Sequence, residues 1–401
     1  MATALLVAAT LSTFIWIGLI LFRGQFWRAD QVMEDIETAS RYRPFDEWPD
    51  VLALIPARNE AETIAAIVEA HGQSDYPGSY SLIVVDDHSD DGTAERAAGI
   101  QSSREISIVS APDLQSGWSG KLWAVKAGLA TIDQMPRKPQ YVLLTDADIL
   151  HAPDTAKSLV LKAETGKLAL VSLMAQLDCR GFWGKLLVPP FIFFFQKLYP
   201  FPKINDPTSS QAGAAGGCML VYLEALNAIG GIEAIRHALI DDCALASALK
   251  GNPPKNSIWL GLSSSVRSLR DNRSLESIWT MVARTAFTQL FHSNILLILS
   301  IFGMVLTYLA GPLALVLAFP TQNPALALAG LAAWLLSAFA FWPTTRLYGL
   351  NPAWTLTLPL AATFYSMMTL TSAINHWRGR GGQWKGRHYT NLTTDDPAST
   401  G

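Results

Sequence analysis

A long apolar segment near the amino terminus restricts where this chain can reside. Residues Thr3–Phe22 carry no charged side chain, and about 20 apolar residues suffice for a helix that crosses a bilayer. The segment lacks the basic start and the A-x-A-like cleavage site of a secretory signal, so we expect a retained membrane anchor. Arg23 and Arg28 follow at once. Because positive residues stay on the cytoplasmic side, they predict that the next domain faces the cytoplasm.

Three more apolar segments lie near the other end of the chain and favour a membrane region over a soluble core. They are Asn294–Phe319, Pro324–Phe341 and Ala353–Ile374. A basic tail follows, with Arg378, Arg380, Lys385 and Arg387. Three complete crossings from the cytoplasm would place this tail outside, against the positive-inside rule. We therefore expect one segment to be re-entrant or interfacial, with the tail in the cytoplasm.

The aromatic segment Gly184–Pro202 reads GKLLVPPFIFFFQKLYPFP and is interrupted by prolines and flanked by lysines. These features favour a segment that lies on the membrane surface over one that crosses the membrane. A buried core loop is the alternative.

Composition excludes several classes of protein. Half of the residues are hydrophobic, 16% are charged, and the formal net charge is −3, so the chain has no basic field to attract nucleic acid. Cys179, Cys218 and Cys243 form no CxxC pair and no metal-ligand spacing. We expect them to be reduced core residues.

The middle of the chain alternates short apolar runs with helical patterns. The runs predict strands at Val51–Ile55, Leu82–Val85, Ile106–Val109 and Tyr141–Thr145. Between them, the pattern predicts helices over Glu60–Ala70, from about Thr93, and over Lys121–Ala130. This alternation is typical of a parallel sheet with helices on both faces. In such sheets, ligands bind beyond the carboxyl ends of the strands.

Polar clusters follow three of these strands directly. They are PARNE after the first strand, DDHSDDGT after the second and TDAD at the end of the fourth. The chain contains neither a Walker-type loop nor a G-x-G-x-x-G loop, so no glycine-rich cradle is present for phosphates. A Mg²⁺ or Mn²⁺ ion that bridges carboxylates and a diphosphate is the remaining simple solution.

The acids in these clusters have different candidate roles. Asp146 and Asp148 are two residues apart, so on an extended chain both would face one ligand; a turn or helix cap is the alternative. Asp86 and Asp87 emerge directly from a strand and are candidates for hydrogen bonds to a nucleotide base or ribose. The run Asp90–Thr93 is better explained as a turn and helix N-cap.

Two further positions are candidates for chemistry. Lys121 ends a glycine-flanked loop, GWSGK, and is either a contact to a diphosphate or a solvated surface lysine. Asp241 and Asp242 begin a helical pattern. They are either acids favoured by the helix dipole or the position of a general base.

In this order, PARNE, VVDDHSDDGT, TDAD and the late acidic pair resemble the family-2 glycosyltransferases. The resemblance implies a Rossmann-like α/β GT-A fold, the nucleotide-diphospho-sugar transferase fold, with transmembrane helices at both ends. With its apolar ends and W-K-G-R tail, the whole chain resembles the hopene-associated glycosyltransferases of bacterial hopanoid pathways, which are similar to the ceramide glucosyltransferase type. This implies an inner-membrane protein whose catalytic domain faces the cytoplasm.

The resemblance also implies roles for individual residues. Asp242 matches the catalytic base, and Asp148 matches the usual metal ligand of the DxD pair. The positions that match donor-binding residues are Pro56, Arg58, Asn59, Glu60, Asp86, Asp87, Lys121 and Asp146. The Q/R-x-x-R-W motif of processive and ceramide-type members is absent, which argues against polymer synthesis. Arg284 is the nearest position to that motif, and it is assigned to the acceptor side with Asp241 and Trp279.

These roles predict an inverting sugar transfer from a nucleotide-sugar, expected to be UDP-linked, to a hydroxyl of a membrane lipid, with Mg²⁺ or Mn²⁺ as cofactor. Transfer to a polyprenyl phosphate is the nearer alternative, and a non-catalytic membrane scaffold with a degenerate nucleotide-binding fold is the other. The predicted division is an anchor (1–24), a tether (25–47), a cytoplasmic GT-A domain (48–292), membrane segments (293–376) and a basic tail (377–401).

Overall fold

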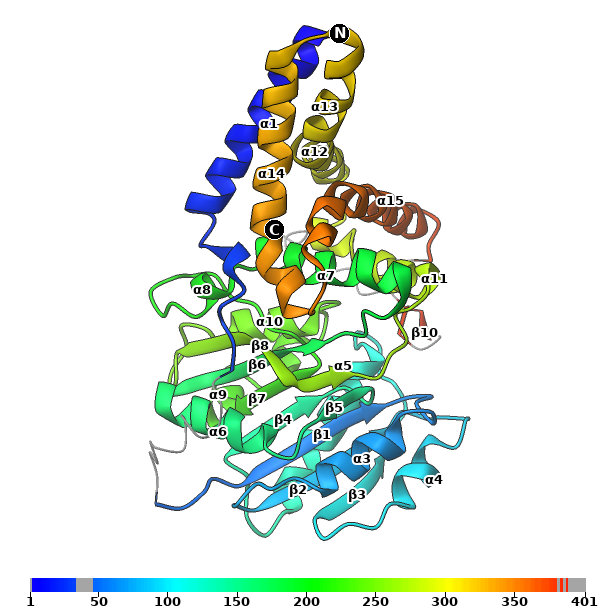
Figure 1. Cartoon of the computed structure of the whole chain (residues 1–401). Coiled ribbons are helices and arrows are strands. Elements are labelled where there is room, and N and C mark those ends of the chain that lie inside the picture. Colours follow the sequence, from blue (N-terminus) through cyan, green and yellow to red (C-terminus); the bar gives the residue numbers. More distant parts are fainter. Residues whose placement is uncertain (1, 34–45, 381–382, 385–386, 389–401) are drawn as a thin grey trace, which may run out of the picture. The chain divides into compact units, whose positions relative to one another are not determined.

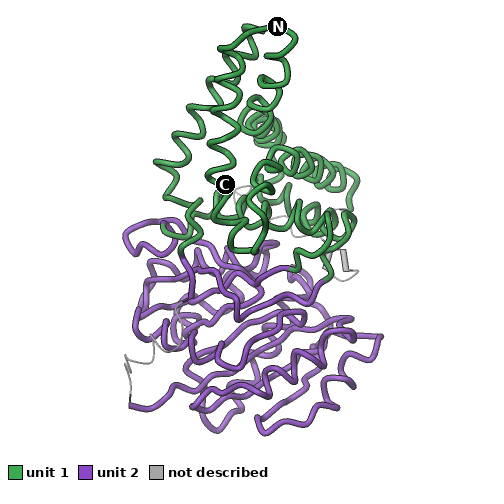
Figure 2. The backbone as a smooth tube through the Cα atoms, viewed as in Figure 1, with its two compact units in different colours: residues 1–30, 178–202, 271–381 green, residues 31–177, 203–270, 382–401 purple. Residues whose placement is uncertain are grey.

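The computed structural model describes residues 2–33, 46–380, 383–384 and 387–388. The chain divides into two compact units (Figure 2). Unit 1 comprises residues 1–30, 178–202 and 271–381, and unit 2 comprises residues 31–177, 203–270 and 382–401. The residues predicted to form the GT-A domain, 48–292, are therefore divided between the two units, because residues 178–202 and 271–292 cluster with unit 1. Parts of the predicted tether and most of the predicted tail lie outside the described residues.

Unit 2 is built on an eight-stranded sheet (Figure 1). In spatial order, its strands are β3 (Glu105–Ser110), β2 (Tyr80–Asp86), β1 (Val51–Ala57), β4 (Tyr141–Thr145), β7 (Cys218–Tyr222), β6 (Leu168–Gln176), β8 (Ser257–Ser268) and β5 (Ile149–His151). The four predicted strands, β1 to β4, are present and run parallel to their neighbours among them. A short antiparallel pair, β9 (Gln383–Trp384) and β10 (Arg387–His388), forms a separate sheet.

The second half of the large sheet is mixed. Strand β7 runs antiparallel to both β4 and β6, and β5 runs antiparallel to β8. The prediction of a parallel sheet rested on β1 to β4 and is confirmed for them, but it does not extend to this half. The chain reaches β7 through residues 178–217, part of which belongs to unit 1, instead of through the single crossover helix that joins parallel neighbours.

Helices cover both faces of the sheet, as predicted. Side chains alternate between the faces of a strand, so Ile55 of β1 packs in one core with Ile67, while Leu54 lies against Gly128 on the other face. The helices of unit 2 are α3 (Ile64–Gly72), α4 (Thr93–Ala98), α5 (Gly120–Ala130), η2 (Thr131–Gln134), α6 (Thr155–Gly166), α9 (Leu223–Ala228), η3 (Ile232–Ile235) and α10 (Asp241–Leu249). Helix α8 (Phe201–Ile204) spans the boundary between the units.

Close packing of α5 on the sheet yields a test of the fold. A Cβ atom at Gly128 would lie 2.5 Å from Leu54 Cδ1 and 2.8 Å from Val85 Cγ2. We expect Gly128→Ala to lower the free energy of unfolding by about 1–3 kcal/mol, the usual cost of overpacking, seen as a lower melting temperature in detergent. Gly99→Ala is the control, since its nearest neighbour atom would be 3.5 Å away. Equal melting temperatures would contradict the tight α5 packing.

Unit 1 is helical, and α1 (Ala2–Phe22), α13 (Ala310–Thr321) and α14 (Pro324–Leu347) run side by side in it (Figure 1). Its other helical elements are η1 (Phe26–Arg28), α7 (Gly181–Leu198), α11 (Leu275–Ala283), η4 (Thr288–Leu290), α12 (Asn294–Met304), η5 (Val305–Leu309), η6 (Pro352–Thr357) and α15 (Leu358–Trp377). Helix α7 continues through Pro189 and Pro190, so the expected proline break is absent, and its Phe193 is buried against Trp16 and Phe26.

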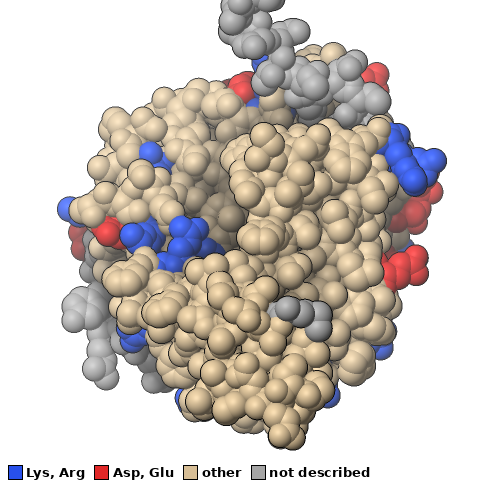
Figure 3. Space-filling model, turned by 90° about the horizontal axis from the view of Figure 1, so that it is seen from above, with Lys and Arg blue, Asp and Glu red and all other residues tan. Residues whose placement is uncertain are grey.

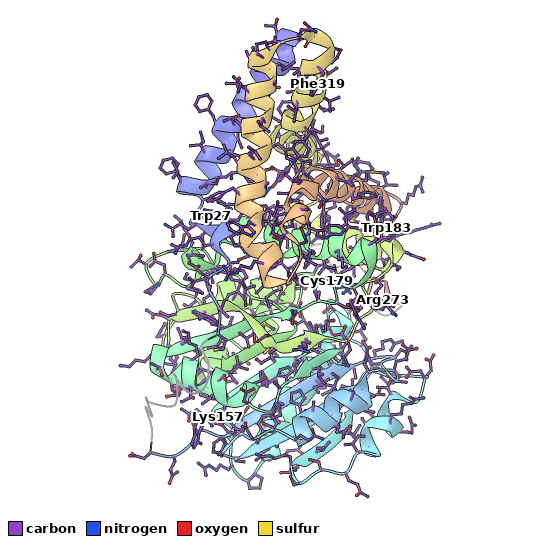
Figure 4. All side chains as sticks on the ribbon, viewed as in Figure 1. Trp27, Lys157, Cys179, Trp183, Arg273 and Phe319 are labelled. Carbon is purple, nitrogen blue, oxygen red and sulfur yellow. The ribbon has the colours of Figure 1, made fainter. Side chains whose placement is uncertain are left out.

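Three helices of the described chain are long and apolar enough to cross a membrane: Ala2–Phe22, Asn294–Thr321 and Pro324–Leu347. Helix α15, in the fourth predicted segment, is not among them. Apart from Val32 and Leu269, the large exposed apolar side chains of the described residues all lie in unit 1. The face in Figure 3 accordingly shows broad areas without charge. Phe319 of α13, 80% exposed, is one of these side chains (Figure 4).

The π-helical turn η5 interrupts the second of these helices, and side chains of α1 bind one of its carbonyls. Ser12 Oγ and Trp16 Nε1 of α1 both donate to the Thr307 carbonyl, each at 2.9 Å. In a bilayer, backbone groups find no water, so such side-chain donors stabilise an irregular turn.

The cysteines are free, as expected, although only Cys218 is fully buried.

Candidate active site

The carboxyl ends of β1, β2 and β4 meet at one edge of the sheet, and the predicted motif residues gather there. Strand pairing aligns Ala57 with Asp86. Arg58 follows β1, and its Nη1 lies 3.5 Å from Asp87 Oδ2 and also donates to the Asp87 carbonyl. Asp86 Oδ2 accepts the Ser89 N–H at 3.2 Å, whereas its buried Oδ1 has no hydrogen-bond partner among the described residues. Such an oxygen suits a ligand hydroxyl or amide.

The first two loops are joined by hydrogen bonds. Three consecutive N–H groups of the first loop donate to side chains of the second: Asn59 to Ser89, Glu60 to Thr93 and Ala61 to Asp91. These side chains satisfy N–H groups that precede α3, which begins at Ile64 instead of the predicted Glu60. Asp91 also accepts the Thr93 N–H at 3.1 Å, which agrees with the turn predicted for Asp90–Thr93.

The chain is not extended from Asp146 to Asp148, because β4 ends at Thr145. The prediction that both side chains lie on the same side of an extended chain is therefore wrong. The chain turns after β4, and the Ile149 N–H donates to the Asp146 carbonyl at 3.2 Å. Asp146 Oδ1 lies 3.0 Å from Lys121 Nζ, and Asp148 Oδ2 lies 3.1 Å from Arg270 Nη2. The turn therefore brings the two carboxylates to different cations.

Lys121 links this edge to the second acidic pair. Its Nζ lies 3.0 Å from Asp146 Oδ1 and 3.1 Å from Asp241 Oδ2. Ser119 sets the start of α5 by accepting the Leu122 N–H. The side chain of Lys121 is only 19% exposed, so it is not a solvated surface lysine. Burial lowers its pKa, but the charges of Asp146 and Asp241 outweigh burial and hold the pKa above the ordinary value.

Asp242 is fixed by two backbone donors. Gly216 N–H donates to its Oδ2 at 2.8 Å, and Cys243 N–H donates to its Oδ1 at 2.7 Å. A Cβ atom on Gly216 would lie 3.2 Å from Oδ2, so glycine permits this close approach. Burial and the charge of Asp241 raise the pKa of Asp242 to about 6, against the opposing charge of Lys121. A pKa raised toward neutral pH suits a carboxylate that accepts a proton.

A pocket in unit 2 lies beside Lys121 and the two acids that pair with it. Its charged lining residues are Lys121, Asp146 and Asp241, and Pro56, Thr145 and Gly216 also line it. Its apolar lining residues are Leu122, Val125, Leu144, Met219, Ile232, Ile235 and Leu245. An apolar wall with a few convergent charged groups is typical of a ligand site.

The acids after β4 suit a hard divalent ion. Asp146 and Asp148 offer carboxylate oxygens, the ligands that Mg²⁺ and Mn²⁺ prefer. No group of three or more His, Cys, Asp or Glu side chains in the described part of the chain is arranged to hold a metal. An ion held by one or two of these carboxylates would complete its coordination with water and diphosphate oxygens.

Two residues of the site were missed by sequence reasoning. The only sequence signal for Gly216 was the Gly216-Gly217 pair before β7, and Arg270 belongs to no local motif. Two predicted acceptor-side residues, Trp279 of α11 and the exposed Arg284 that caps it, belong to unit 1. Their role stays a prediction.

Comparison with known proteins places this site in a family context. Residues 53–230 match the model of the family described as glycosyl transferase family 2. This region is a family-2 glycosyltransferase domain. The matched residues contain most of β1, all of β2 to β7, and the acids after β2 and β4, and they end before Asp241 and Asp242. The mixed sheet of this glycosyltransferase is the Rossmann-like GT-A fold that the sequence predicted.

Solved structures similar to this glycosyltransferase include a mannosyltransferase from Pyrobaculum calidifontis in complex with GDP-Man and Mn²⁺. It is 19% identical, with 93% of this chain and 99% of that chain covered and a TM-score of 0.49. Glucosyl-3-phosphoglycerate synthase of M. tuberculosis is 21% identical, with 65% and 88% covered and a TM-score of 0.39. Mannosyl-3-phosphoglycerate synthase from Rubrobacter xylanophilus is 19% identical, with 68% and 85% covered and a TM-score of 0.40. A search of curated proteins finds no match.

Proposed function

We propose that this glycosyltransferase moves a sugar from a UDP-linked donor to a hydroxyl of a membrane lipid, with inversion at the anomeric carbon and with Mg²⁺ or Mn²⁺ as cofactor. The observation that carries the proposal is the position of Lys121, which pairs with both Asp146 and Asp241 in one pocket. Acids suited to a metal–diphosphate and an acid suited to proton transfer thus lie within one site.

On the donor side, the loops after β1 and β2 supply polar contacts. Asp86 and Asp87 accept hydrogen bonds from the nucleoside, and Pro56, Arg58, Asn59 and Glu60 form the wall of its site. Lys121 pairs with the diphosphate as a point charge. Asp148, with Asp146 beside it, would hold a bound Mg²⁺ or Mn²⁺, which would supply positive charge to stabilise the leaving diphosphate.

On the acceptor side, Asp242 acts as the general base. It takes the proton of the acceptor hydroxyl as the hydroxyl oxygen attacks the anomeric carbon, opposite the bond to the diphosphate. That bond breaks, the electron pair leaves with the diphosphate, and the configuration inverts. The pKa of about 6 at Asp242 supports this role, because an effective general base has a pKa near the working pH.

A lipid acceptor is supported by the three helices that are apolar enough to cross a membrane. A water-insoluble acceptor requires an enzyme that resides at the bilayer, whereas a soluble acceptor does not. The finer proposal of a hopanoid acceptor rests on the resemblance of the sequence motifs and of the apolar ends.

The proposal is tested by incubating the purified full chain with Mn²⁺, bacterial lipid extract and radiolabelled sugar donors. The panel includes UDP-glucose, UDP-galactose, UDP-N-acetylglucosamine and GDP-mannose. We expect label in the organic phase from a UDP-linked donor, and its loss when EDTA removes the metal. Labelled lipid from GDP-mannose alone would overturn the choice of nucleotide. Absence of labelled lipid with every donor would overturn the lipid acceptor.

Membrane topology gives a separate prediction. The three candidate spans are Ala2–Phe22, Asn294–Thr321 and Pro324–Leu347. If each crosses the membrane once and α1 begins outside, the tail after Trp377 lies in the cytoplasm. The turn between α13 and α14 then lies outside. We expect a single cysteine at residue 391 to resist a membrane-impermeant maleimide in intact cells and to react after permeabilisation. A cysteine at Gln322, which is exposed between the two helices, should react in intact cells. The native cysteines would first be replaced by serine. A tail that reacts in intact cells would contradict three crossings.

A further inference from the structure

The carboxylate of Asp148 is paired with a cation from a distant part of the chain. Arg270 Nη2 lies 3.1 Å from Asp148 Oδ2, with side chains 39% and 10% exposed respectively. A carboxylate this buried is costly without a countercharge, so Arg270 stabilises the ionised form of Asp148. None of the motifs assigned above contains Arg270.

Backbone contacts place Arg270 at this point. Strand β5 pairs with the end of β8, which aligns Ile149 with Ser268. The Leu269 N–H then donates to the Asp148 carbonyl at 2.8 Å. The main chain on both sides of the ion pair is therefore held, and the long side chain of Arg270 is the part that is able to move.

The neighbouring acid is arranged in the same way, since Asp146 pairs with Lys121 at 3.0 Å. Both carboxylates proposed for the metal–diphosphate thus carry a protein cation in this structure. Arginine presents five N–H donors in a planar fork that matches the oxygens of a phosphate. A guanidinium released from Asp148 would have a diphosphate within its reach, provided that the proposed donor site is correct.

We propose that Arg270 is a donor-binding residue that exchanges partners: it pairs with Asp148 in the free enzyme and with the donor diphosphate in the complex. The inference rests on the proposed function, because it requires a metal–diphosphate at Asp148. When a metal ion binds alone, it competes with Arg270 for the carboxylate of Asp148. When the ion binds together with a nucleotide diphosphate, Arg270 pairs with the diphosphate instead. The ion and the nucleotide therefore strengthen each other's binding, and by linkage the coupling is the same in both directions.

The test measures two affinities by titration calorimetry of the full chain in detergent. One is the Kd of Mn²⁺ alone, and the other is the Kd of UDP at saturating Mn²⁺. In Arg270→Met, which keeps the aliphatic stem and removes the charge, we expect Mn²⁺ alone to bind more tightly and UDP to bind more weakly. Each change should be on the order of 10-fold, the worth of a charge-assisted hydrogen bond.

Matched variants assign these changes to the proposed exchange. Arg267→Met is the control, because Arg267 lies near the end of β8, three residues before Arg270, is exposed, and donates through Nε to the Ser264 carbonyl. It should leave both affinities unchanged. Arg270→Lys should keep Mn²⁺ alone weak and retain part of the UDP affinity. Asp148→Asn should abolish the tight Mn²⁺ binding of Arg270→Met.

Opposite changes in the two affinities support the proposal. Two unchanged affinities, or a parallel loss of both as in a misfolded protein, overturn it. Its failure is separable from failure of the proposed function. If the wild-type chain binds UDP only with Mn²⁺ while Arg270→Met behaves like Arg267→Met, the partner exchange is wrong and the donor site stands. If the wild-type chain binds neither UDP nor GDP, the proposed donor site is wrong.

Discussion

Replacing Asp242 with asparagine is expected to lower turnover by on the order of 10²–10⁴, the usual worth of a positioned acid or base, and to leave donor binding nearly intact. The amide keeps the shape of the carboxylate and one oxygen for the Gly216 N–H, but it cannot accept the proton of the acceptor hydroxyl. The measurements are the initial rate at saturating donor and lipid, and the Kd of UDP with Mn²⁺.

The neighbouring variant Asp241→Asn is the control for Asp242→Asn. Asp241 begins the same helix and pairs with Lys121 at 3.1 Å, so it shares the local charge but leaves the proposed base in place. Its loss of turnover should be smaller. Equal losses would remove the reason to assign the base to Asp242. Full activity in Asp242→Asn would favour an acceptor that is already an anion, such as a polyprenyl phosphate, since that acceptor needs no base.

Replacing Lys121 with methionine should affect both halves of the reaction. The variant loses the cation proposed for the diphosphate, and the loss of one charge-assisted hydrogen bond predicts a fall in kcat/KM at pH 7 of roughly 10- to 100-fold. It also removes the charge that lowers the pKa of Asp242 against burial and the charge of Asp241. The pKa of Asp242 should therefore rise in the variant.

The pH profile separates these two effects. A general base works when it is deprotonated, so wild-type kcat/KM should fall as the pH drops through about 6, the pKa of Asp242. In Lys121→Met this acid limb should move to higher pH. Lys126→Met is the control, because Lys126 lies on the same helix but pairs with Glu233 at 3.1 Å. An acid limb at the same pH in Lys121→Met and wild type would show that Asp242 and Lys121 are not coupled.

The first half of the sheet was predictable from sequence because its signals are local. A buried parallel strand shows as a continuous apolar run, and β1 to β4 appear at the predicted places with small shifts at their ends. Parallel strands joined by helices point their carboxyl ends to one edge. The gathering of Arg58, Asp87 and Asp146 at that edge follows from the order of these elements.

The second half of the sheet and the direction of the two acids after β4 were not predictable in this way. The reversal of β7 follows a long path through residues of unit 1, which no apolar run reveals. The turn at Asp146–Ile149 depends on β5 pairing with β8, more than 100 residues later in the chain. A period-two argument holds only while the chain stays extended.

By itself, the sequence determined the elements that depend on local chemistry: the apolar helices, the first four strands, and the acid-rich loops of a glycosyltransferase domain. Only the tertiary structure decided which charges meet. Lys121 between Asp146 and Asp241, Gly216 against Asp242, and Arg270 on Asp148 all join segments that are distant along the chain. A charge in a sequence carries no mark of its partner, because that partner is set by strand pairing and helix packing over the whole unit.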